Sequence, residues 1–118
     1  MEAKKILIVD DEEGIRLLYQ EELEMDGFAV ETAKNGDQAL EKFKAAPPDL
    51  VILDINMPGM NGIEVLRQMK SHNAALPVIL SSAYPEYKQD FGAWASEEYI
   101  VKSANMNELK AAVHKHLD

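Results

Sequence analysis

The sequence predicts one α/β domain in which a parallel sheet of five strands is covered by helices on both faces. Short runs of aliphatic residues recur along the chain, and such runs are typical of strands buried on both faces. Longer segments lie between them, with apolar residues spaced every three or four positions as in amphipathic helices. Because every connection contains a helix, the strands have no hairpin partner and are expected to pair in parallel.

The elements follow one another in a regular order. Strands are predicted at residues 6–9, 28–33, 50–53, 78–80 and 99–101. The first helix carries an apolar stripe and is expected to end at Gly27; the stripe consists of Ile15, Leu18, Tyr19 and Leu23. Residues 72–77 are predicted to form a loop. Turn and capping residues mark the other helices. Asn35-Gly36 begins the second helix and Pro47-Pro48 ends it. The third begins at Asn61-Gly62, the fourth at Tyr84-Pro85 and the fifth at Asn105.

Composition excludes several classes of protein. At 118 residues the chain has the size of one domain, and the absence of cysteine excludes disulfides and thiolate metal sites. The net charge of −9 opposes direct binding to nucleic acid or to an anionic membrane. No apolar stretch is long enough to span a bilayer, and a strand-like run follows the first five residues directly. We therefore expect a cytoplasmic protein without a signal peptide.

Acidic residues follow two of the predicted strands. Asp10 and Asp11 come directly after the first strand, and Asp54 directly after the run Leu50–Leu53. If these strands are neighbours, the carboxylates converge, and they repel one another unless they are protonated or held by a cation. A few oxygen ligands with room for water suit Mg²⁺.

Two further strand ends supply a hydroxyl, Ser82, and an ammonium group, Lys102. Taken singly, each of these residues fits an ordinary role, as a loop serine, a surface lysine or acids at a helix N-terminus. Together with the acids they match a phosphoryl group, since a carboxylate can form an aspartyl-phosphate and cations neutralise the transferred charge. The combination predicts a site for a phosphoryl group.

Four motifs resemble those of receiver domains of two-component response regulators, and the resemblance covers essentially all 118 residues. They are Val9-Asp10-Asp11-Glu12, the stretch from Asp54 through Pro58-Gly59 to Gly62, Ser82-Ala83, and Tyr99-Ile100-Val101-Lys102. The resemblance implies a flavodoxin-like (βα)5 fold with strand order 2-1-3-4-5. It also implies that residues 1–118 form one receiver domain, a bacterial signalling module that is not an enzyme acting on a separate substrate.

The same resemblance assigns roles within the site. Asp54 would be the phosphoacceptor. Mg²⁺ would be held by Asp10, Asp11, Asp54 and the backbone carbonyl of Asn56. The donor would be a sensor histidine kinase or a histidine phosphotransfer protein, and the output would be binding to a further protein, with the chain a monomer or weak dimer.

The resemblance further implies a switch. Ser82 and Lys102 would contact the phosphoryl group, and Tyr99 would turn inward when Ser82 moves. Asn56 and Tyr84 would tune the lifetime of the phosphorylated state. In the family a proline in a cis peptide usually follows the lysine, whereas this chain has Ser103; a cis bond there would cost about 3–4 kcal/mol.

Three other functions are possible for a fold of this kind. A docking module that works without phosphorylation is suggested by Ser103 but opposed by the intact acids and Lys102. A phosphatase with an aspartate nucleophile would need a second aspartate where this chain has Asn56. A flavin site is excluded because acids, and not a Ser/Thr/Gly-rich loop, follow the first strand.

Overall fold

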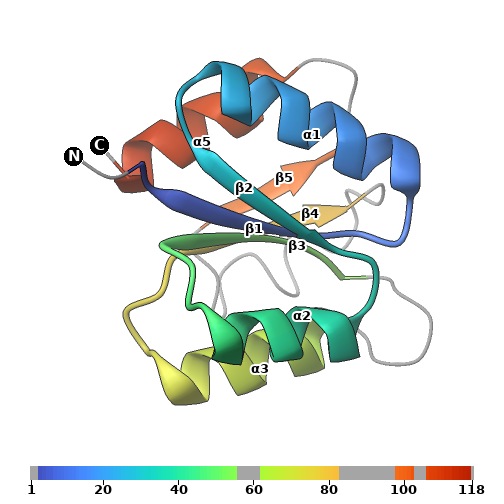
Figure 1. Ribbon diagram of the computed structural model, residues 1–118, viewed down its shortest axis with the longest axis vertical. Helices are drawn as coiled ribbons and strands as arrows, with labels where there is room; N and C mark the ends of the chain where they lie inside the picture. The colour runs from blue at the N-terminus through green and yellow to red at the C-terminus, as the bar shows by residue number, and fades with distance from the viewer. Residues whose placement is uncertain (1–2, 56–61, 83–97, 103–105, 118) are drawn as a thin grey trace.

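The fold is a five-stranded parallel sheet between two layers of helices (Figure 1). The computed structural model describes residues 3–55, 62–82, 98–102 and 106–117. The strand order is β2-β1-β3-β4-β5, which confirms the expected fold class. The strands are β1 (Lys5–Val9), β2 (Ala29–Ala33), β3 (Leu50–Asp54), β4 (Val78–Ser82) and β5 (Glu98–Val101).

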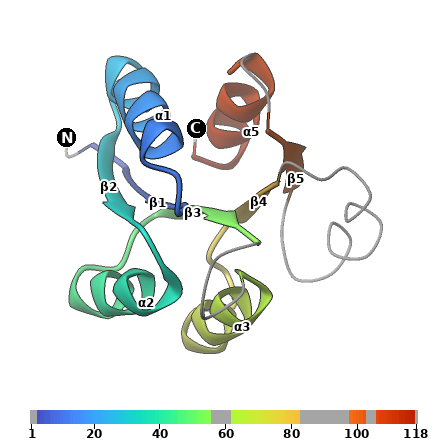
Figure 2. The same ribbon diagram turned by 90° about the vertical axis from the view of Figure 1, so that its right-hand side faces the viewer.

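Helices cover both faces of the sheet, as predicted. Figure 2 shows α1 and α5 on one face of the sheet, which we call the α1/α5 face, and α2 and α3 on the other, the α2/α3 face. The helices are α1 (Glu13–Met25), α2 (Gly36–Ala45), α3 (Gly62–His72) and α5 (Asn107–Leu117). The predicted helix that begins at Tyr84-Pro85 and the predicted helix start at Asn105 lie outside the described residues. No helix in the described part of the chain is long and apolar enough to cross a membrane.

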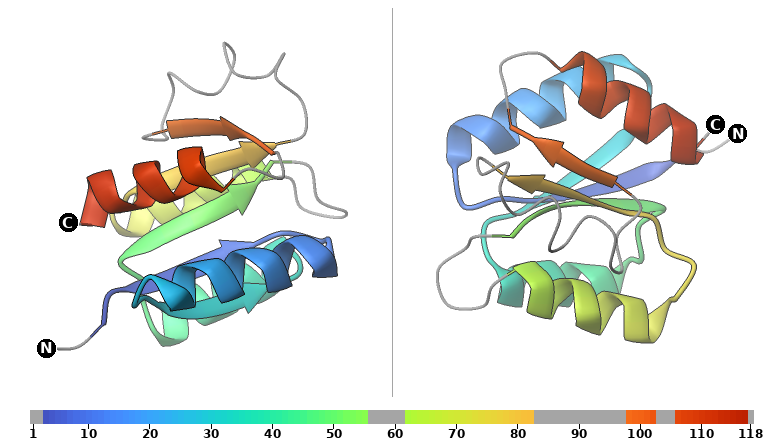
Figure 3. Two further views of the ribbon diagram at one scale, coloured as in Figure 1. Left: turned by 90° about the horizontal axis from the view of Figure 1, so that it is seen from above. Right: turned by 180° about the vertical axis from the view of Figure 1, so that it is seen from behind.

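Alternation along the strands divides the core in two. All five strands run the same way (Figure 3), and residues in register across the sheet point to the same face. The α1/α5 face buries a cluster that includes Ile6, Ile8, Leu50, Ile52, Ile79 and Ile100. The α2/α3 face buries a second cluster that includes Leu7, Val9, Val51, Leu53, Val78, Leu80 and Tyr99. Burial on both faces explains why these strands are continuous aliphatic runs.

Local signals in the sequence mark the helix ends. Gly27 has φ 97°, and its N–H donates to the Glu24 carbonyl at 3.0 Å, while the Phe28 N–H donates to Leu23 at 3.2 Å. This is a Schellman ending, for which glycine has no steric cost. At the start of α2, Asn35 Oδ1 accepts the Gln38 N–H at 2.8 Å. Both features confirm the predicted boundaries.

Two details of the sequence prediction are wrong. The sequence predicts Leu18 in the buried stripe of α1, but it is 37% exposed, whereas Tyr19 and Leu23 are 3% and 0% exposed. Positions 15, 19 and 23 are spaced four residues apart and define the face of α1 that lies toward the sheet. Leu18 is therefore rotated about 100° around the helix axis from the centre of that face. His72 was placed in a loop, but it is the last residue of α3.

Gly62 allows α3 to begin directly against the end of β3. Its N–H donates to the Ile55 carbonyl at 2.9 Å. A Cβ at this position would lie 2.3 Å from the Asp54 carbonyl oxygen and 2.5 Å from the Ile55 Cα, both of which are backbone atoms. A side chain here would therefore displace the strand end that carries Asp54.

We predict that Gly62→Ala lowers the free energy of unfolding by about 2–3 kcal/mol, because the backbone must move to accept the methyl group. Gly14→Ala is the matched control, since a Cβ at Gly14 has no atom within 4 Å. That variant should be unchanged or more stable by up to about 1 kcal/mol through helix propensity. Urea unfolding measures both, and equal stability of the two variants would show that the close approach does not constrain the fold.

Candidate functional site

The carboxyl ends of β1 and β3 bring two buried carboxylates together. Asp10 follows β1 directly, Asp54 ends β3, and these strands are neighbours. Both continue the alternation of the α1/α5 face, so their side chains leave the sheet on the same side. Asp10 is 2% exposed and Asp54 4% exposed. Two carboxylates buried so close to each other need a positive partner.

Lys102 supplies that partner. It follows β5, and its backbone N–H donates to the Ser82 carbonyl at 2.7 Å. Its Nζ lies 2.7 Å from Asp10 Oδ2 and 3.2 Å from Asp54 Oδ2. Burial by itself would lower the pKa of Lys102, but the hydrogen bond and charge of Asp10, together with Asp54, outweigh burial and raise the pKa above its usual value. The ammonium group therefore stays charged and joins the ends of three strands.

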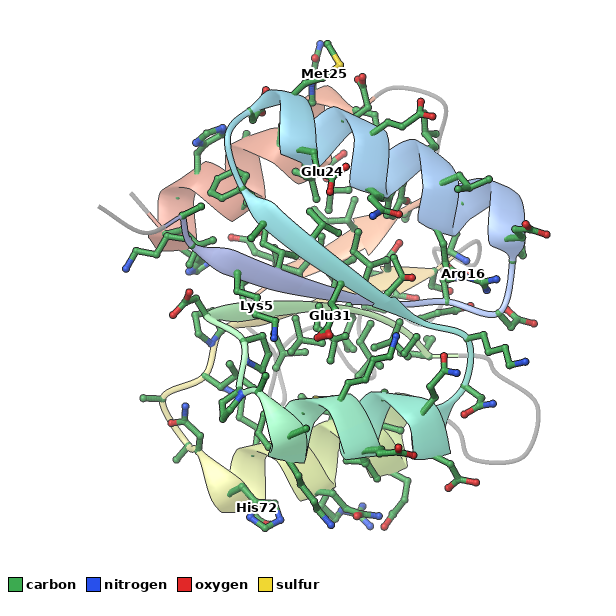
Figure 4. The ribbon with its side chains drawn as sticks, in the orientation of Figure 1. Lys5, Arg16, Glu24, Met25, Glu31 and His72 are labelled. Atoms are coloured by element: carbon green, nitrogen blue, oxygen red, sulfur yellow. The ribbon has the colours of Figure 1, made fainter. Side chains whose placement is uncertain are left out.

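The loop after β1 holds Asp10 in place. Its second carboxylate oxygen, Oδ1, accepts the Glu12 N–H at 2.9 Å. Its backbone carbonyl accepts a hydrogen bond from Arg16 Nη1 at 2.7 Å, and Arg16 reaches it from the first turns of α1 (Figure 4). With both carboxylate oxygens and the carbonyl engaged, Asp10 has little freedom to rotate.

A hard cation could be held at the outer rim of this site. Carboxylate oxygens of Asp10, Asp11 and Glu12 all lie within 4.8 Å of one another. Asp10 is buried, whereas Asp11 and Glu12 are exposed, so the rim combines fixed ligands with access for water. An oxygen-only donor set of this kind fits Mg²⁺. The predicted fourth ligand, the carbonyl of Asn56, lies outside the described residues.

The two predicted switch residues lie on the α2/α3 face. Ser82 is fully buried, and alternation places it on the same face as Leu80. Tyr99 is 4% exposed, is in register with Leu80 on the neighbouring strand and belongs to the same cluster. Ser82 and Tyr99 therefore lie at diagonal positions of adjacent strands, on the same face of the sheet. Tyr84 and the Lys102–Ser103 peptide bond lie outside the described residues.

Two polar residues near the site were not predicted to belong to it. The sequence predicts Tyr19 in the apolar stripe of α1 and Ser81 at the end of a strand. The Tyr19 hydroxyl lies 3.4 Å from Ser81 Oγ, and both residues are buried. Alternation along β4 places Ser81 on the same face as Ile79, and this is also the face of Asp54.

The chain belongs to the response regulator receiver domain family, whose model matches residues 6–114. Among curated relatives, sporulation initiation phosphotransferase F of Bacillus subtilis is 40% identical, over 99% of this chain and 96% of that protein. Regulatory protein AtoC of Escherichia coli is 38% identical over 96% of this chain, which spans only 25% of AtoC. The family thus includes proteins of this length and proteins in which the receiver is one part.

Solved structures agree with this assignment. The response regulator TrrA of Thermotoga maritima, in complex with Mg²⁺-BeF, is 48% identical with a TM-score of 0.92, covering 97% of this chain and 99% of TrrA. TrrA in complex with the histidine kinase ThkA matches with a TM-score of 0.90, over 98% of this chain and 99% of that one. The fold and the kinase-bound relative place this chain among two-component receivers.

We predict that Lys102→Met lowers the free energy of unfolding by about 3 kcal/mol without divalent metal, because two buried carboxylates lose their shared cation. Added Mg²⁺ should restore more stability to this variant than to the wild type. Lys115→Met is the control. The Lys115 side chain forms an ion pair with Glu98 but is 68% exposed, so losing this ion pair should cost less than about 1 kcal/mol. Urea unfolding with and without Mg²⁺ measures the free energy of unfolding of each protein. A Lys102→Met protein as stable as the wild type would contradict the prediction.

Proposed function

We propose that the chain is a phosphorylatable response regulator receiver that takes a phosphoryl group onto Asp54 from a sensor histidine kinase or a histidine phosphotransfer protein. The observation that carries this proposal is the buried Asp54 carboxylate, held by Lys102 beside the acidic rim. The kinase complex of TrrA, which is 48% identical to this chain, supports the proposed donor.

The transfer itself needs little from the protein beyond position and charge. An Asp54 carboxylate oxygen would attack phosphorus in line with the phosphorus–nitrogen bond of the donor phosphohistidine. The new phosphorus–oxygen bond would form as the imidazole leaves with the electron pair of the broken bond. Lys102 is already at the carboxylate, and its ammonium group can follow the charge onto the phosphoryl oxygens.

Magnesium would be held by Asp10, Asp11, Asp54 and the carbonyl of Asn56, and the magnesium–beryllofluoride complex of TrrA supports this assignment. When bound, Mg²⁺ supplies positive charge for the transferring phosphoryl oxygens. The chain's own contribution is to hold Asp10 rigidly, through Glu12 and Arg16, so that one ligand is already in place.

The output would be a change of surface. The added charge, near −2, would draw Ser82 and Lys102 toward the phosphoryl group, and Tyr99 beside Ser82 would follow. Asn56 and Tyr84 would set how long the phosphorylated state lasts. A downstream protein in the cytoplasm of a bacterium would read the change, with the receiver itself a monomer or weak dimer and not an enzyme for a separate substrate.

We predict that incubation with Mg²⁺ and acetyl phosphate adds one phosphoryl group, seen by intact mass spectrometry. Asp54→Asn and a metal-free sample should gain none. Asp37→Asn is the matched control because Asp37 is an exposed acid in the first turn of α2, far in sequence from the site. It should react like the wild type.

Failure of the wild type to gain mass, with no Mg²⁺ binding by calorimetry, would favour a docking module that works without phosphorylation. Multiple turnover of a small phosphate ester would instead indicate a phosphatase.

A further inference from the structure

A buried pair of hydroxyl groups lies on the site side of the sheet and has no part in the function proposed above. Tyr19 is 3% exposed and Ser81 is 1% exposed, and their oxygens are 3.4 Å apart. Tyr19 comes from α1 and Ser81 from β4, so the pair joins two elements that are separated by 62 positions. The other buried residues of the cluster on the α1/α5 face are apolar. Burying a polar pair among such side chains costs free energy.

Register places this pair beside the phosphoacceptor. Ser81 is the direct partner of Asp54 in the β3–β4 ladder, and both side chains leave the sheet on the α1/α5 face. Helix α1 packs against β1 and β2, yet the Tyr19 hydroxyl meets β4. Since β3 lies between β1 and β4, the Tyr19 side chain extends across the strand that carries Asp54.

The hydrogen bond between the two hydroxyl groups uses only one of their two donor protons. Among the described residues, this bond is the one side-chain hydrogen bond that either hydroxyl makes. When Tyr19 donates to Ser81, the hydroxyl proton of Ser81 is left beside Asp54, the register partner of Ser81.

The charges of the site act on the phenol. Burial raises the pKa of Tyr19, and Lys102, Asp10 and Asp54 also influence it, Lys102 in the opposite direction to the two acids. All three charged residues are therefore within electrostatic range of the hydroxyl. The dipole of the phenol in turn acts on the ammonium group and on the acceptor carboxylate.

We propose that Tyr19 and Ser81 form the polar inner wall of the phosphorylation site and position the Lys102 ammonium and the Asp54 carboxylate for phosphoryl transfer. The inference rests on the proposed function and adds two positioning residues to it. Neither hydroxyl touches the transferred group. They act by keeping the inner side of the site polar where the rest of that face is aliphatic.

The test compares Tyr19→Phe, Ser81→Ala and the double variant with the wild type. Each single change leaves one buried hydroxyl without its partner, so the urea midpoint should fall, whereas the double variant should recover it. The rate of phosphorylation by acetyl phosphate with Mg²⁺ should fall about 3- to 10-fold in all three, which is the loss of one such hydrogen bond expressed as a rate. Ser71→Ala, an exposed serine hydroxyl on α3, should change neither quantity.

A second measurement does not require phosphorylation. The ¹⁵Nζ resonance of Lys102 in the metal-free protein, identified by its loss in Lys102→Gln, should shift in the double variant, while that of Lys115 stays in place. A double variant with the wild-type phosphorylation rate and an unshifted Lys102 signal would overturn the proposal and leave the pair as an ordinary part of the core. If the wild type gains no phosphoryl group, the proposed function fails, and the Lys102 signal alone decides whether the pair positions the ammonium group.

Discussion

The ammonium group of Lys102 between the carboxylates of Asp10 and Asp54 is the interaction on which the site depends. It connects the ends of β1, β3 and β5, which the sheet order separates by as much as three strand positions. Without a cation, two acids buried at this edge would oppose folding. The folded state therefore contains a positive charge at the place where the proposed phosphoryl transfer would need one.

The rest of the fold fixes the positions of those three groups. Parallel register sets Asp10 and Asp54 at adjacent strand ends, and the two aliphatic clusters hold the sheet from both sides. Gly62 then lets α3 start against the backbone of Asp54 and Ile55, which leaves the end of β3 little room to shift. A site that works by position and charge needs such a rigid base.

Much of this was predictable from the sequence, because aliphatic strands and helix ends are local signals. The runs around Ile8 and Ile52 and the glycine at position 27 specify their own conformations. The partners of a side chain are not local. Tyr19 fits an apolar stripe by spacing, and only the tertiary structure brings its hydroxyl to Ser81. Likewise, the exposure of Leu18 depends on how α1 is rotated over the sheet.

The pairing of Lys102 also bears on how the switch can work. In this structure the Lys102 ammonium group contacts Asp10 and Asp54 and lies 3.8 Å from Glu12, so the phosphoryl group proposed on Asp54 would draw it away from Asp10. Because Asp10 would then lose its cation, a metal at the acidic rim and a phosphoryl group on Asp54 would favour each other. The buried network would therefore couple the two events, since a charge that arrives at one of its carboxylates changes the electrostatic balance at the others.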